Sequence, residues 1–287
     1  MESDGWPDGA ISRAEADRML RSADAIRARA ASVPRGHALL QLMYSVMLAA
    51  YMALFVYTGS NEGGASVFGG TTMALVLPPM IVSTGLVNGA AERHGGRLRS
   101  TGRHWTAIGV FLALLVVILV WGIAGGGYPW WLAPVSAVVT IVLFGSRPAA
   151  VLVRGSGTPQ RTAEREPLSP GPRTVTIVMG VYFGIVCMML VVPSAIWAVT
   201  AIGMVAVIIA LSAQTASWGL MRTGWEWAVP QWLAFAAAVA AMFLLASLVI
   251  VGDVITPLIA VLAGGVVAAA LVASALLPGR SHVASEA

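Results

Sequence analysis

Long apolar stretches alternate with short polar ones along most of this chain. A helix that crosses a bilayer needs about 20 mostly apolar residues, and eight stretches come close to or exceed that length. They cover residues 39–57, 66–90, 105–123, 130–144, 174–191, 194–212, 231–251 and 254–277. Because the run from 174 to 212 would be about 60 Å long as one helix, twice the thickness of a bilayer core, we divide it at Val192-Pro193-Ser194.

The longest polar break inside the apolar region, residues 147–173, divides these stretches into four and four. The sequence therefore predicts an all-α, polytopic membrane protein with eight transmembrane helices and both termini cytoplasmic, and it suggests two four-helix halves. The predicted segments are a cytoplasmic N-terminal segment (1–37), a first membrane half (38–146), a cytoplasmic linker (147–173), a second membrane half (174–278) and a cytoplasmic tail (279–287).

The basic residues support this topology. All 17 are arginine, which is typical of a GC-rich bacterial genome. With both termini inside, the outward loops are 58–65, 124–129, 192–194 and 252–253, and none of them contains an arginine. Arginine is enriched on the cytoplasmic side of membrane proteins, so this partition favours eight spans over seven or nine. We expect the protein in the plasma membrane of a bacterium.

Composition also identifies lipid as the main solvent. Charged residues make up 10% of the chain, against about 25% in soluble domains. The single cysteine, Cys187, excludes a disulfide within the chain and a cysteine-based metal site. Before the first apolar stretch, Ser12 and Glu15 fit a capping box that opens a helix over about 13–31. This helix either lies on the membrane or a partner, or packs loosely on its own protein.

The second apolar stretch carries Pro78-Pro79 near its centre, and we expect its helix to bend or break there. Transporters build sites in broken helices with polar groups nearby. The candidate substrate-pathway residues are Pro78, Pro79, Thr71, Thr72, Ser83, Thr84 and Asn88. The alternative is a kinked structural helix whose freed carbonyls are bound by serine and threonine hydroxyls.

Small residues recur at four-residue spacing, which lets membrane helices approach closely. Gly85 and Gly89 form one such pair, and Gly265, Ala269 and Ala273 form a row in the last stretch. We expect these faces to pack within the bundle, with a dimer face as the alternative.

A polar loop after the second stretch offers an inner-face site. Four arginines are candidates for binding anionic lipid headgroups: Arg93, Arg97, Arg99 and Arg103. Glu92, His94 and His104 lie in the same region and could in principle do acid–base chemistry, although their spacing is no zinc signature. The alternative is an arginine cluster that only sets topology.

The sequence lacks the residues that several classes of function require. No ionisable residue falls inside a predicted span, which disfavours a proton-coupled carrier unless acids at the membrane surface project inward. The chain contains no nucleotide-binding glycine motif, H-E-x-x-H or C-x-x-C, so we expect no cofactor and no metal. Its net charge of +4 is distributed by topology, and nucleic-acid binding is not expected.

We therefore expect a non-enzymatic integral membrane protein, a permease-like subunit or accessory component of a transport or export system. The expected partners are membrane lipids and a cytoplasmic protein such as an ATPase subunit. Two alternatives are a structural or regulatory membrane partner of a cytoplasmic protein and a lipid-modifying enzyme acting at the inner face.

Overall fold

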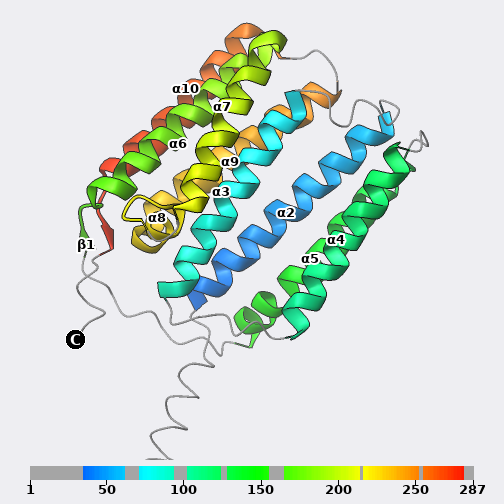
Figure 1. Ribbon diagram of the computed structural model, residues 1–287, viewed down its shortest axis with the longest axis horizontal. Helices are drawn as coiled ribbons and strands as arrows, with labels where there is room; N and C mark the ends of the chain where they lie inside the picture. Colours follow the sequence, from blue (N-terminus) through cyan, green and yellow to red (C-terminus); the bar gives the residue numbers. More distant parts are fainter. Residues whose placement is uncertain are drawn as a thin grey trace, which may run out of the picture.

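The structure is a bundle of long, roughly aligned helices (Figure 1). It is a computed structural model, which describes residues 35–61, 71–93, 102–123, 128–154, 165–213, 216–251 and 255–280. The first helices are α2 (Arg35–Asn61), α3 (Thr71–Arg93), α4 (Gly102–Ile123) and α5 (Leu132–Val153). The later ones are α6 (Pro170–Met188), the 3-10 turn η2 (Met189–Val191), α7 (Pro193–Ser212), α8 (Leu220–Glu226), α9 (Val229–Val251) and α10 (Pro257–Leu276).

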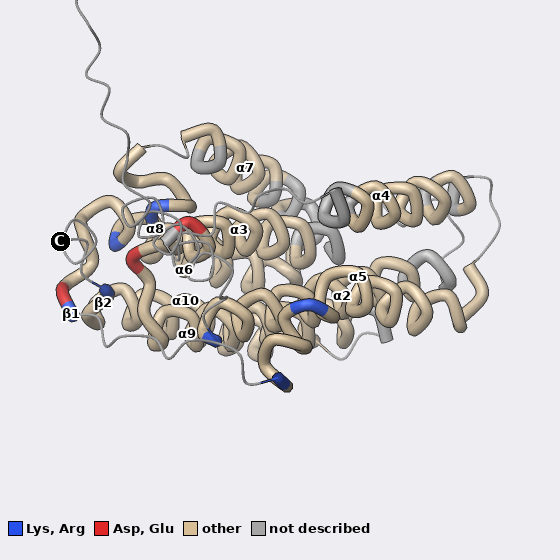
Figure 2. The backbone as a smooth tube through the Cα atoms, turned by 90° about the horizontal axis from the view of Figure 1, so that it is seen from below, with Lys and Arg blue, Asp and Glu red and all other residues tan. Residues whose placement is uncertain are grey.

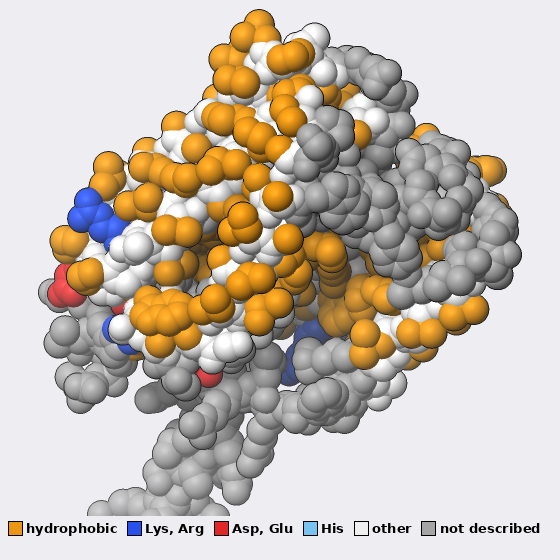
Figure 3. Space-filling view, turned by 45° about the horizontal axis from the view of Figure 1, so that its top comes forward, with side chains coloured by type: hydrophobic (Ala, Val, Ile, Leu, Met, Phe, Trp, Pro, Cys, Tyr) orange, Lys and Arg blue, Asp and Glu red, His pale blue; other side chains and the backbone are white. Residues whose placement is uncertain are grey.

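Five segments of these helices are long and apolar enough to cross a membrane, judged by length and composition. They are Arg35–Tyr57, Leu132–Val153, Pro170–Val191, Val229–Val249 and Pro257–Leu276. The outward faces of these segments are apolar too, as Val138, Leu244 and Val266 are 59%, 61% and 67% exposed. Figure 3 shows hydrophobic side chains spread over the visible face of the bundle. The prediction of an all-α membrane protein is confirmed at this level.

The break predicted in the long fifth and sixth stretch is present. The helical backbone of α6 and η2 ends at Val191, and α7 starts at Pro193. Val192 between them has φ −125° and ψ 79°, which is not helical. A proline at the first turn of a helix suits α7, because its missing N–H would have had no partner there.

Most helix ends differ from the prediction by a few residues, and two of them have a clear physical reason. α5 continues nine residues past the predicted end at Phe144 and takes Pro148 into the helix, because Ala149, Ala150 and Leu152 favour helix. α10 is capped by Thr256, whose hydroxyl accepts the Ile259 N–H at 3.3 Å. Pro257 takes the first helical position, so its neighbour Thr256 becomes the N-cap.

Helix α2 lies between two apolar clusters. Its Tyr51 and Leu54 belong to the larger cluster, which also draws residues from α3 and α6 to α10. Its Met52 and Val56 belong to a smaller cluster with Ile118 of α4 and residues of α5. The core therefore does not divide at the linker, since α3 packs with helices that follow it by a hundred residues or more.

Small residues set the closest helix contacts. A Cβ on Gly89 would lie 1.8 Å from the Met221 carbonyl oxygen, so α3 and α8 touch through backbone. The same holds for α6 and α10, where a Cβ on Gly184 would lie 2.8 Å from both the Ala268 Cβ and the Gly264 carbonyl oxygen. Gly89 thus packs within the chain, as expected.

The row of small residues predicted to pack in the last span is wrong by one residue. A Cβ on Gly265 would meet nothing within 4 Å, and Ala269 and Ala273 are exposed. The packed face is instead Gly264 and Ala268. One residue rotates a helical position by about 100°, so apolar composition alone did not distinguish the two faces.

Charged residues gather at one end of the bundle. Figure 2 shows charges of both signs around α8, β1 and β2 and further basic positions near α2 and α5, whereas α7 and α10 contain no charged residue. β1 (Arg165–Glu166) and β2 (Gly279–Arg280) form an antiparallel pair that joins the end of the predicted linker to the predicted tail. The predicted helix over 13–31 lies outside the described residues.

Candidate functional site

The candidate pathway residues lie on α3, and those whose side chains are described divide between its buried and its exposed side. Pro78, Pro79 and Ser83 are buried against the bundle. Thr84 and Asn88, one turn apart, are exposed on the other side. A pathway along α3 would therefore use the Thr84 and Asn88 face and not the prolines themselves.

The sequence predicts a bend or a break at the two prolines, and the helix is not broken there. α3 is one continuous helix through Pro78 and Pro79. The hydroxyls of Ser83 and Thr84 both donate to the Met80 carbonyl, at 2.7 and 2.9 Å. The carbonyls that lose their partners to proline lie four residues before each proline, so these hydroxyls do not compensate for them. Helix packing on the buried side holds the prolines in place.

A hydroxyl pair joins α2 to the exposed side of α3. The oxygens of Tyr44 and Thr84 are 3.0 Å apart. Because the Thr84 hydroxyl already donates to the Met80 carbonyl, Tyr44 is the donor to Thr84. Thr71 and Thr72 form the first turn of α3, and their side chains lie outside the described residues.

The inner-face candidates are only partly within the described residues. Glu92 is exposed in the last turn of α3, and Arg93 ends that helix. Arg103 and His104 lie in the first turn of α4, but only their backbone is described. His94, Arg97 and Arg99 lie outside the described residues. Within the described chain, no group of three or more His, Cys, Asp or Glu side chains could hold a metal ion.

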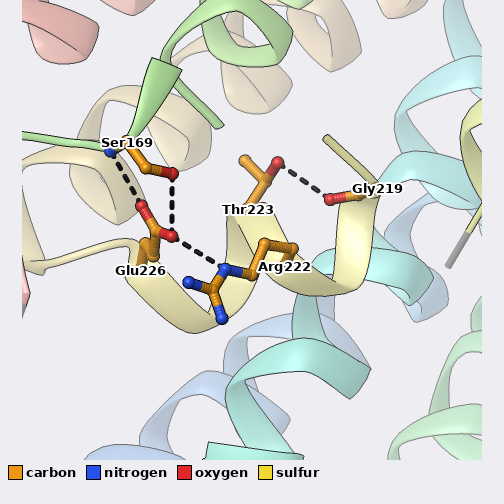
Figure 4. A network of polar contacts seen from close by, with 5 residues as sticks. All are labelled: Ser169, Gly219, Arg222, Thr223 and Glu226. Atoms are coloured by element: carbon orange, nitrogen blue, oxygen red, sulfur yellow. Dashed lines mark hydrogen bonds and ion pairs between the residues drawn. The ribbon is translucent and has the colours of Figure 1, made fainter. Parts of the chain in front are cut away.

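The best-formed polar site was not predicted. Glu226, at the end of α8, is 5% exposed and accepts three hydrogen bonds (Figure 4). Ser169 donates its backbone N–H at 3.0 Å and its hydroxyl at 2.9 Å, and Arg222 donates from Nε at 2.9 Å. Ser169 is the N-cap of α6, so the carboxylate ties the start of α6 to α8.

Arg222 is held on two sides. Its Nε binds Glu226 one turn later, and its guanidinium carbon lies 4.8 Å from the centre of the Trp225 ring. The ion pair and the stacking orient the guanidinium together. All three donors converge on the Glu226 carboxylate, which therefore joins the start of α6 to α8.

A second polar network lies beside the first. Trp227 Nε1 donates to the Thr176 hydroxyl at 3.0 Å. Gln231 is fully buried, and its Nε2 donates to the carbonyls of Ser274 and Leu277 at 3.0 and 3.1 Å. Its Oε1 accepts the Ala228 N–H at 3.0 Å. Gln231 thus satisfies backbone groups at the start of α9 and the end of α10, where helices leave such groups unpaired.

The two networks, which we name the end clamp (Ser169, Thr176, Arg222, Glu226, Trp227, Gln231), join α6, α8, α9 and α10 at the charged end. The signal in the sequence was the isolation of Glu226, the only acidic residue between Glu166 and Asp253. Gln231 at the start of an apolar stretch was the second signal.

Comparison with known proteins gives no relative: no family model, no curated protein and no solved structure matches this chain. Function must therefore be inferred from the residues of the chain itself.

Proposed function

We propose that the protein is a non-enzymatic multi-pass membrane protein, a permease-like subunit or accessory component of a transport or export system. In this proposal eight helices span a bacterial plasma membrane with both termini cytoplasmic. The exposed α3 face of Thr84 and Asn88, with Tyr44 of α2 bonded to Thr84, lines the substrate pathway. The observation that carries the proposal is the Tyr44–Thr84 hydroxyl pair, which bridges α2 and α3 on the exposed side.

This face is unusual for a surface that contacts lipid. Elsewhere the exposed positions of the spanning helices are filled by residues such as Val120, Leu244 and Val266. An exposed amide such as that of Asn88 is disfavoured in hydrocarbon without partners and favoured along a hydrated path. An uncharged path of this kind suits a polar or amphipathic substrate better than an ion.

Cysteine accessibility tests the proposal directly. The one native cysteine, Cys187, is 0% exposed and should not react with the reagent. The Thr84→Cys and Asn88→Cys variants should react with a charged, membrane-impermeant thiosulfonate in intact cells or inside-out vesicles, because only hydrated thiols ionise and react. The matched control, Leu244→Cys on the exposed face of α9, should not react. The pathway is wrong if all three variants are equally inert.

A structural or regulatory role is the second candidate, and the end clamp favours it. A rigid end made of α6, α8, α9 and α10 would suit the docking of a cytoplasmic protein such as an ATPase subunit. In this case Thr84→Cys stays inert, whereas deletion of residues 1–32 or replacement of the exposed linker residues by a Gly/Ser segment removes partner binding. An unchanged complex after both changes would exclude this role.

A lipid-modifying enzyme at the inner face remains the third candidate, with Glu92, His94 and His104 as its residues. The triple change Glu92→Gln, His94→Ala and His104→Ala should abolish the cellular phenotype if this role is correct. A phenotype that survives the triple change excludes it.

A further inference from the structure

Two arginines face each other across the short ribbon at the charged end. In the β1–β2 pair, Arg165 is directly opposite Arg280. Directly opposed residues of an antiparallel pair point to the same face, with Cβ atoms about 5 Å apart. Like charges in this position destabilise the pair. The two guanidinium groups therefore repel each other, and a bound anion would remove this repulsion.

The protein does not supply that anion among its described residues. Neither Arg165 nor Arg280 has an ion-pair partner in the described part of the chain. Glu166 is opposite Gly279, on the other face of the ribbon. Glu226, whose backbone approaches Gly279, already accepts from Ser169 and Arg222. Burial lowers the pKa of the Arg280 guanidinium, as expected for a partly desolvated cation without a counter-charge.

The ribbon also lies where a membrane surface would be. β2 starts three residues after the end of the apolar helix α10, and β1 ends four residues before the start of α6. Leu276 and Leu277, just before β2, are 62% and 46% exposed. An exposed apolar pair three and four residues before Arg280, which is itself opposite Arg165, matches the acyl chain and the phosphate of one phospholipid.

We propose that Arg165 and Arg280 together bind the headgroup phosphate of one anionic phospholipid, with its acyl chain against Leu276 and Leu277. Guanidinium groups bind phosphate oxygens in a paired geometry, so two of them can share one phosphate. A headgroup without a net positive charge is preferred, because a choline would bring a cation close to both arginines. This site uses other residues than the headgroup candidates Arg93, Arg97, Arg99 and Arg103, and it does not depend on the proposed transport role.

Native mass spectrometry of the full chain measures how many phospholipid molecules the protein retains and which headgroup they carry. The protein is delipidated in detergent and titrated with phosphatidylglycerol or with phosphatidylcholine of the same acyl chains. Wild type should retain one phosphatidylglycerol with clear preference over phosphatidylcholine. Arg165→Gln and Arg280→Gln should each weaken the first phosphatidylglycerol by about tenfold, as loss of a charged hydrogen bond does. The control Arg154→Gln, at the exposed end of α5, should not change it.

A charge reversal separates loss of binding from loss of folding. Arg165→Glu places a carboxylate opposite Arg280, so it should abolish lipid retention while raising the melting temperature of the lipid-free protein. Wild type that binds both lipids equally, or Gln variants that retain phosphatidylglycerol as wild type does, would overturn the proposal. Competition by soluble glycerol phosphate as effective as the lipid would show a site for free phosphate and overturn it too.

Discussion

Trp227 Nε1 donates a 3.0 Å hydrogen bond to the hydroxyl of Thr176, 51 positions earlier in the chain. The bond ties the approach to α9 to the second turn of α6. The Thr176 hydroxyl in turn donates to the Pro172 carbonyl at 2.7 Å, so one buried oxygen serves both as acceptor and as donor. The Trp227 ring is 1% exposed and lies edge-on to Trp232, with ring centres 5.2 Å apart.

Thr176→Val should lower the free energy of unfolding by about 1–3 kcal/mol, because it leaves the indole N–H buried without an acceptor. The valine keeps the volume of threonine, so packing is preserved. Thermal unfolding in detergent measures the loss. In a Trp227→Phe background the same change should cost about 1 kcal/mol less, since no indole N–H is left to satisfy. Equal costs in both backgrounds would show that the bond contributes nothing.

Glu226→Gln should destabilise the end clamp by about 1.5–3 kcal/mol. The glutamine amide offers one acceptor oxygen to three donors, and its NH₂ group faces donors of Ser169 or Arg222. Glu166→Gln on the exposed β1 strand removes the same charge and is the matched control. The measurement is the melting temperature, followed by intrinsic tryptophan fluorescence. A similar shift for the two variants would mean that charge and not hydrogen bonding matters.

Gly264→Ala and Gly265→Ala form a pair that differs by one position. A Cβ at Gly264 would lie 2.5 Å from the Gly184 carbonyl oxygen, so α10 must move from α6 at a cost of about 1–3 kcal/mol. A Cβ at Gly265 meets nothing within 4 Å, and alanine should stabilise the helix by up to about 1 kcal/mol. Unfolding of both variants in one detergent tests the register of α6 against α10. The reverse order would contradict that register.

Replacing Pro78 or Pro79 with alanine should stabilise α3. The gain in helix propensity is about 3 kcal/mol, and the loss of about two buried methylene groups costs about 1.6 kcal/mol, so a net gain of about 1 kcal/mol is expected. If the exposed face of Thr84 and Asn88 is the pathway, cellular function survives the change. A stable but inactive Pro78→Ala variant would instead mean that the prolines shape the pathway.

Apolar length was a good predictor of the long helices, because lipid exposure requires long runs without charge whatever the tertiary contacts are. It was a poor predictor of helix ends, as Pro148 inside α5 shows. Arg147-Pro148 reads as the start of a loop, yet the alanines that follow continue the helix into the polar region.

The end clamp could not be predicted, since it depends on three-dimensional approach. The seven-residue helix α8 is too short for its periodicity to stand out. The partner of Glu226 is a serine 57 positions earlier, which nothing in the local sequence indicates. The local sequence also could not distinguish Gly264 from Gly265. Both positions suit close packing, and only the contact of Gly264 with Gly184 shows which of them lies at the helix interface.

The position of α2 between two clusters has a consequence for synthesis. The hydroxyl of Tyr51 reaches the Val239 carbonyl, 188 positions later. At about 5–20 residues per second, the ribosome needs roughly 10–40 s to make that partner after Tyr51 has emerged. The sides of α2 that face α3, α4 and α5 find their partners early, whereas the contacts of Tyr51 with Val239 and Phe243 of α9 form only after α9 is made. A nascent chain halted after α5 should therefore hold a paired α2 that still offers one unburied face to lipid or to an insertion factor.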